Sequence, residues 1–131
     1  MIITEQYLAG FFDGEGCVNC SKGRNDVPHV MISISGTCKK LLEEISKKYG
    51  GKVYIKNKYK DHHTQAYSWH VSKYREFVED ILPFTNIKTE QLKCALDFLE
   101  TVDKHVTRKG LTKETLNKRV QIMNRIKELN K

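Results

Sequence analysis

Residues Tyr7 to Gly16 read Tyr-Leu-Ala-Gly-Phe-Phe-Asp-Gly-Glu-Gly, and this stretch decides the fold. If it is helical, Leu8, Phe11 and Phe12 share one face, which we expect to pack against the chain's own core. The opposite arc carries mostly small residues, namely Gln6, Ala9, Gly10 and Asp13. Because glycine costs a helix about 1 kcal/mol relative to alanine, such a face makes sense where a second helix approaches closely. We expect Gly14 and Gly16 to end the helix.

Glu15 lies at the carboxyl end of this predicted helix, where a negative charge is electrostatically misplaced. A cation at that end would make the position favourable. A carboxylate and the free carbonyls of a last helical turn are hard oxygen ligands, which suit Mg²⁺ or Ca²⁺. Glu15 and Gly14 are therefore the candidate metal ligands. Two such helices packed through their small faces place two metal sites side by side, an arrangement suited to cleaving two phosphodiesters.

Residues 8–16 resemble the LAGLIDADG motif of the homing endonucleases. The sequence departs from the consensus in Phe11, Phe12 and Gly14, and in Glu15, which replaces the second aspartate. The two phenylalanines keep the core face apolar. Glutamate keeps the charge and the oxygen ligands and adds one methylene of reach.

The composition fits an intracellular protein with a polyanionic partner. The chain has 131 residues, enough for one domain with a core, and 23 Lys and Arg against 16 Asp and Glu give a net charge of +7. We find no apolar run of the ~18–20 residues that a membrane helix needs, and no signal or transit peptide. These features predict a protein that is not secreted, from a bacterial or phage cytoplasm or an organelle lumen, with no membrane or small-molecule partner.

Cysteine usage favours free thiols in a reducing compartment. Cys17 and Cys20 form a single Cys-x-x-Cys, without the second pair that a zinc site usually needs. On a strand, their odd spacing directs the two thiols to opposite faces.

The hydrophobic pattern predicts two helix–hairpin units followed by three helices. Alternating strands are expected at residues 17–22 and 29–35 and again at 52–58 and 65–71, and Leu41, Leu42, Ile45 and Tyr49 form one helical stripe between the hairpins. Ser72 is expected to cap the next helix, which Pro83 ends. Two more helices follow, with stripes that comprise Leu92, Ala95, Leu96, Leu99 and Val102, and Leu116, Val120, Met123 and Ile126.

The predicted fold class is α+β, with one domain over residues 1–131. The core (about 4–103) is an αββαββα half-domain with a concave antiparallel sheet, and a helical extension follows at about 111–131. Helices cover a single face of the sheet. Val53, Ile55, Tyr67, Trp69 and Val71 are expected to face these helices from the second hairpin.

The uncovered sheet face is a candidate DNA-binding surface. A two-stranded ribbon fits the DNA major groove, where lysines neutralise phosphates and polar side chains contact base edges. The alternative is an ordinary solvated sheet face, where lysines discourage edge pairing. The expected DNA-binding residues are Asn19, Ser21, Lys22, Arg24, His29, Met31, Ser33, Ser35, Lys52, Tyr54, Lys56, Lys58, Ser68 and His70.

The element order is that of the LAGLIDADG half-domain, and a second segment strengthens the resemblance. Leu82-Pro83-Phe84 followed by Ile87-Lys88-Thr89-Glu90-Gln91 is similar to a later part of the family's sequence. The resemblance implies that Lys88 is the active-site basic residue near the scissile phosphates. Family members often carry a glutamine and an arginine after the second strand. Residues 35–40 contain no glutamine, and Lys39 or Lys40 is the candidate replacement for the arginine.

Single-motif members of this family are homodimers, so the resemblance implies an interface formed by Ala9, Gly10 and Asp13. It also implies a site-specific double-strand DNA endonuclease that acts on a pseudo-palindromic target. The expected cofactor is Mg²⁺, with Mn²⁺ or Ca²⁺ able to replace it in binding. The alternatives are a non-cleaving DNA-binding protein or an intron RNA-splicing maturase on the same fold, and an unrelated structural module.

Overall fold

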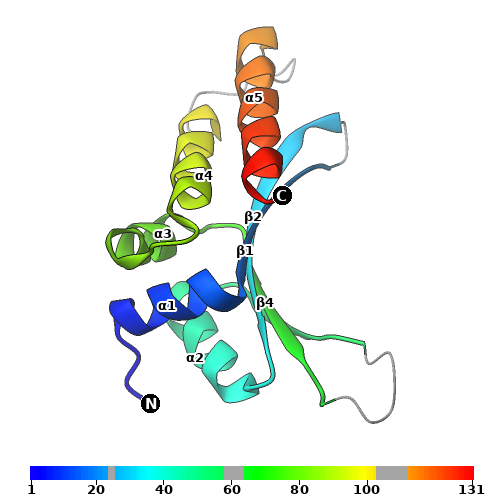
Figure 1. Ribbon diagram of the computed structural model, residues 1–131. Helices are drawn as coiled ribbons and strands as arrows, with labels where there is room; N and C mark the ends of the chain where they lie inside the picture. The colour runs from blue at the N-terminus through cyan, green and yellow to red at the C-terminus, as the bar shows by residue number, and fades with distance from the viewer. Residues whose placement is uncertain (24–25, 58–63, 103–111) are drawn as a thin grey trace.

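The computed structural model describes residues 1–23, 26–57, 64–102 and 112–131. The elements are α1 (Glu5–Glu15), β1 (Gly16–Lys22), β2 (Pro28–Gly36), α2 (Lys39–Tyr49), β3 (Lys52–Ile55), β4 (Tyr67–Val71), α3 (Arg75–Ile81), the 3-10 helix η2 (Leu82–Phe84), α4 (Thr89–Val102) and α5 (Lys113–Leu129). The four strands form one antiparallel sheet in the order β1-β2-β4-β3. Figure 1 shows the helices packed on one side of the sheet, whose two hairpins diverge toward opposite ends. The predicted α+β architecture is confirmed.

Strict alternation along β2 builds the sheet's two faces. Val30, Ile32 and Ile34 are buried beneath the helices, while the residues between them are exposed or half-buried. β1 follows the same rule, so Cys20 is buried and Cys17 is exposed, as the spacing predicts.

The core centres on the ring of Phe77 in α3. Phe12, Tyr49 and Trp69 each present an edge-to-face contact to it, with ring centroids 5.8, 5.1 and 5.0 Å away. The Trp69 indole N–H donates to the carbonyl of Gly50 at 2.9 Å. Since these rings come from α1, α2 and β4, one cluster joins both helix–hairpin units.

The junction of α1 and β1 contains no intervening residue. Glu15 ends the helix and Gly16 begins the strand with a φ of −83°. Gly16 is therefore not a left-handed helix cap, and Gly14 lies inside the helix rather than ending it. A side chain at position 16 would overlap the ring of Phe12, so this glycine is needed for close packing.

The second hairpin and α3 each differ from expectation in one respect. Ile55 lies opposite Tyr67 on the same face as Val53, as expected, but it is 69% exposed on the edge strand β3. Ser72 does not cap α3, because this helix begins at Arg75 and Tyr74 occupies the cap position without a side-chain hydrogen bond. Tyr74 is instead buried, and its hydroxyl donates to the carbonyl of Ala95 at 2.7 Å. Burial raises the pKa of the Tyr74 phenol.

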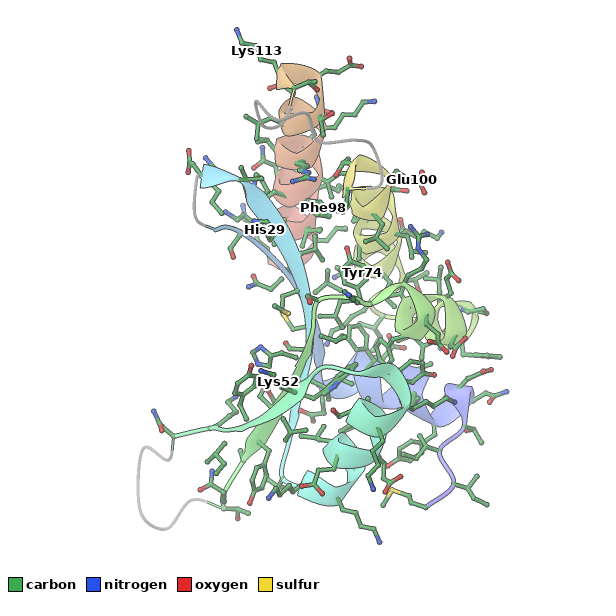
Figure 2. The ribbon with its side chains drawn as sticks, turned by 180° about the vertical axis from the view of Figure 1, so that it is seen from behind. His29, Lys52, Tyr74, Phe98, Glu100 and Lys113 are labelled. Carbon is green, nitrogen blue, oxygen red and sulfur yellow. The ribbon has the colours of Figure 1, made fainter. Side chains whose placement is uncertain are left out.

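Helices α4 and α5 pair with one another and continue the core over β1 (Figure 1). Phe98 is buried here, whereas Val102, expected on the apolar stripe, is 44% exposed. Figure 2 shows Tyr74 and Phe98 on the helical side of the sheet. The Asn130 amide fixes the end of α5 to β1 by donating to the carbonyl of Val18 at 2.9 Å.

Arg119 is buried between α4 and α5. Its guanidinium donates to the Thr101 hydroxyl at 3.0 Å and to the Thr101 carbonyl at 3.3 Å, and lies 5.2 Å from the centroid of the Phe98 ring. Burial lowers the pKa of Arg119. Within the described residues, no helix is long and apolar enough to span a membrane.

Candidate nucleic-acid interface and catalytic centre

The carboxyl end of α1 presents Glu15 to solvent. Glu15 borders a hollow between α1 and the start of α2, lined by Tyr7, Phe11, Gly36, Thr37, Cys38 and Leu41. Within the described residues, no three His, Cys, Asp or Glu side chains converge to form a complete metal site. One exposed carboxylate beside helix-end carbonyls fits Mg²⁺, which is commonly bound by one or two carboxylates together with water and substrate phosphates.

Lys88 reaches the same helix end from the residue before α4. Its ammonium donates to the carbonyl of Phe12 at 3.3 Å and to the carbonyl of Gly16, and lies 5.8 Å from the centroid of the Phe12 ring. A cation at the negative end of a helix dipole is favourable. The structure therefore brings Lys88 to the end of α1 that carries Glu15. Since an ammonium has three donors, one remains for a phosphate.

Lys39 and Lys40 do not line the hollow beside Glu15. Lys39 forms an ion pair with Glu43 at 3.6 Å and lies 5.8 Å from the ring centroid of Tyr67, and Lys40 is exposed. Thr37 and Cys38, which precede α2, border the hollow instead. These two residues were not predicted from the sequence, although their position directly after β2 was a usable signal.

The sheet register places the predicted DNA-binding side chains in rows across the open face. Cys17 is opposite Ser33, Ser33 is opposite His70, and His70 is opposite Lys52. A second row follows with Ser35, Ser68 and Tyr54. Asn19 pairs with Met31, and Ser21 pairs with His29 nearer the tip of the first hairpin. Figure 2 labels His29 and Lys52, which come from different hairpins.

Three predicted DNA-binding residues are not among the described side chains of the open face. Lys22 is in phase with Val18 and Cys20 along β1, so strand alternation places it on the helix-side face rather than the open face, and its ammonium lies 3.7 Å from the Asp26 carboxylate. Its contact with DNA stays a prediction. Arg24 and Lys58 lie outside the described residues.

Hydrogen bonds order the centre of the open face. The Ser68 hydroxyl lies 2.8 Å from the His70 imidazole, and the Ser35 hydroxyl donates to Ser68 at 3.4 Å. The Lys56 ammonium donates to Ser35 at 3.5 Å, and the Tyr54 ring stands edge-on to His70 at 5.2 Å. Ser68 is consequently buried although it belongs to the open face. These contacts fix side chains with donors and acceptors in advance of any ligand.

The expected small-residue interface on α1 is partly wrong. Ala9 is completely buried in the chain's own core, because it projects beside Leu8 and Phe12. Gly10 and Gly14 are exposed, and among the described residues a methyl group at either would meet no atom within 4 Å beyond its chain neighbours and its own helix backbone. The Asp13 carboxylate is used within the chain, where it accepts from the backbone N–H groups of Asn86 and Lys88 at 2.7 and 3.0 Å.

The family model described as LAGLIDADG endonuclease matches residues 8–102. No curated protein matches the chain. Among solved structures, the homing endonuclease I-CvuI in complex with its target and Ca is 23% identical, with a TM-score of 0.75 over 95% of this chain and 80% of that one. The archaeal intron-encoded homing endonuclease I-Vdi141I complexed with DNA is 19% identical, with a TM-score of 0.71 over 97% and 84%. The LAGLIDADG homing endonuclease I-GzeII with its DNA target is 20% identical, with a TM-score of 0.70 over 95% and 44%.

Proposed function

The chain belongs to the LAGLIDADG endonuclease family, and from this premise we propose that it cleaves both strands of a pseudo-palindromic DNA target as a metal-dependent homodimer. Family membership and the likeness to DNA-bound homing endonucleases support a site-specific DNA endonuclease. The observation that carries the proposal is that the Lys88 ammonium binds the carbonyls of Phe12 and Gly16, at the end of α1 that carries Glu15 and leads into the sheet.

Each residue of this pair has a separate role in the proposed reaction. The Glu15 carboxylate and the Gly14 carbonyl would hold a divalent cation, which we propose is Mg²⁺. When bound, such an ion would supply an activated water and positive charge near the phosphodiester. Lys88 directs its remaining N–H toward the phosphate and stabilises the negative charge that develops there. Lys52, Lys56 and the polar rows of the open face hold and read the duplex.

Several features support the homodimer. α1 exposes Gly10 and Gly14, which permit close approach of a second copy. Phe84 and Ile87 are 40% and 72% exposed, and the backbone amides on either side of Ile87 bind Asp13 of α1, so this apolar side chain lies beside the motif helix. The chain also covers 80% or more of some DNA-bound relatives but 44% of the longer I-GzeII chain. That difference is expected if a longer chain contains this unit twice.

Replacing Glu15 by glutamine tests the mechanism. The purified chain is incubated with a DNA library that contains randomised target sites, first with Mg²⁺ and then with Ca²⁺ for affinity alone. We expect Glu15→Gln to lower the single-turnover cleavage rate by about 100-fold or more while DNA affinity in Ca²⁺ is retained, because the amide removes the charged ligand.

The matched control is Glu5→Gln, which removes an exposed carboxylate from the first turn of the same helix. We expect this control to cleave like the parent. Cleavage by Glu15→Gln at the parental rate contradicts the proposed mechanism. Selective binding of RNA with no cleavage of any DNA supports the maturase alternative instead.

A further inference from the structure

Asp13 links two parts of the chain that are far apart in sequence. Its carboxylate oxygens accept one hydrogen bond each, from the N–H of Asn86 at 2.7 Å and from the N–H of Lys88 at 3.0 Å. Asn86 and Lys88 lie 73 and 75 positions after Asp13 in the sequence. Hydrogen bonds to a charged acceptor are stronger than those between neutral groups, so this is a firm attachment.

The side chain of Lys88 returns to the helix that holds its backbone. While Asp13 binds the Lys88 N–H, the Lys88 ammonium binds the carbonyls of Phe12 and Gly16, on either side of Asp13 and Glu15 in sequence. We call this closed set of contacts the Asp13–Lys88 clasp. It fixes both ends of the lysine, its backbone and its charged group, against the last turn of α1.

The segment before α4 has hydrogen bonds of its own. They show whether Asp13 caps the first turn of α4 or positions the turn that precedes this helix. The Thr89 hydroxyl donates to the Thr85 carbonyl at 3.0 Å and closes the turn locally. The first backbone bond of α4 runs from the N–H of Leu92 to the carbonyl of Lys88. Asp13 binds N–H groups that precede the helix and not those of its first turn, so it sets where the turn lies relative to α1.

We propose that Asp13 is a positioning residue for DNA cleavage, which holds the Lys88 ammonium at the end of α1 in register with Glu15. The proposal rests on the function proposed above, because Lys88 matters to catalysis only if this end of α1 is the cleavage site. A displacement of about 1 Å at a reacting centre lowers rates by about 100-fold, which is the sensitivity that such a clasp protects against.

The first experiment measures the position of Lys88 without DNA. Asp13→Asn keeps the size of the side chain but turns an NH₂ group toward one of the two backbone N–H donors. Parent and variant are acetylated briefly with N-hydroxysuccinimidyl acetate, and modification of Lys88 is compared with that of exposed Lys93 by peptide mass spectrometry. We expect Asp13→Asn to raise the modification of Lys88 and to leave that of Lys93 unchanged.

The second experiment measures cleavage on the same proteins. We expect Asp13→Asn to lower the single-turnover rate in Mg²⁺ by about tenfold to 100-fold with DNA affinity in Ca²⁺ unchanged. Glu5→Gln should match the parent in both quantities. Asp13→Glu keeps the charge, so we expect it to recover part of the rate that Asp13→Asn loses. If Asp13→Asn does not fold, Asp13→Glu is compared with the parent, and we expect a smaller change in the same direction in both Lys88 modification and cleavage rate.

The outcomes separate this inference from the proposed function. Unchanged modification of Lys88 in the Asp13 variant overturns the clasp as a positioning device, whatever the DNA result. Increased modification with an unchanged cleavage rate also overturns it, because position then has no catalytic effect. A parent protein that cleaves no DNA contradicts the proposed function itself, and the catalytic part of the inference falls with it.

Discussion

Gly16 shows how a single residue connects the core to the site. Its backbone conformation is open to any amino acid, yet the Phe12 ring occupies the space that a side chain would need. Gly10, six residues earlier, faces open space. The two glycines of one motif therefore have opposite packing environments, which the motif sequence does not reveal.

Paired alanine substitutions test this contrast. We expect Gly16→Ala to lower the free energy of unfolding by about 1–3 kcal/mol, since the new methyl group forces Phe12 from its place. In the single subunit, at a protein concentration that dissociates the proposed dimer, we expect Gly10→Ala to raise it by up to about 1 kcal/mol, because alanine favours the helix. Urea denaturation of both variants gives the comparison. Equal effects at the two positions would refute the packing argument.

At the scale of elements, the sequence predicts those parts that depend on periodicity. Alternation along β2 and the stripe of α2 are confirmed residue by residue, because each element buries one face. Periodicity does not show where the helices cease to cover the sheet or one another. The exposure of Ile55 and Val102 was therefore not predictable from it. The helical wheel predicts Ala9 on the arc opposite Leu8, Phe11 and Phe12, but in the structure Ala9 is buried together with Leu8 and Phe12.

The candidate site also has residues that could be predicted from the sequence and contacts that could not. Its position at a helix end selected Glu15 and the family resemblance selected Lys88, and the structure places Lys88 at the end of α1 that carries Glu15. The intramolecular partners of Asp13 could not be predicted, because Asn86 and Lys88 are brought to it only by the packing of η2 against α1. Long-range polar contacts of this kind follow from tertiary structure and leave no local pattern.

The pairing of α4 with α5 depends on Arg119. We expect Arg119→Lys to lower the free energy of unfolding by about 1–3 kcal/mol, because an ammonium cannot reproduce the planar guanidinium's two bonds to Thr101 and its stacking on Phe98. Arg125→Lys is the matched control on the exposed side of the same helix, with an expected change within about 0.5 kcal/mol. Guanidinium denaturation measures both. Equal losses would show that the buried contacts contribute nothing specific.

At the scale of the whole molecule, buried phenols make the folded state sensitive to alkali. Burial raises the pKa of Tyr74, and burial with the hydrogen bond to Asp80 raises the pKa of Tyr49. Because the pKa of each phenol is higher in the folded state, the protonated phenol contributes its full share to the free energy of unfolding below the pKa of the unfolded chain, about 10. This contribution is lost as pH rises above that value.

Removing one phenol should reduce this sensitivity. We expect Tyr74→Phe to lower the free energy of unfolding by about 1 kcal/mol at pH 7, because the bond to Ala95 is lost. Between pH 10 and 11 we expect its stability to fall less steeply than that of the parent, since one raised pKa is absent. Urea denaturation at pH 7 and through this alkaline range provides the measurement. Parallel pH curves for the two proteins would exclude Tyr74 as a source of the alkaline loss.

The direct connection of α1 to β1 fixes the distance between the candidate cleavage site and the DNA-binding strands. Glu15 and the first strand residues are consecutive links of one chain, with no loop to stretch or shorten. In the proposed dimer, the span from the severed bond to the nearest base read by the hairpin is therefore set by covalent geometry. An added base pair between the half-sites lengthens the duplex by about 3.4 Å and rotates one half-site relative to the other. Because the connection between α1 and β1 has no loop, the proposed dimer cannot adjust to that change in half-site spacing.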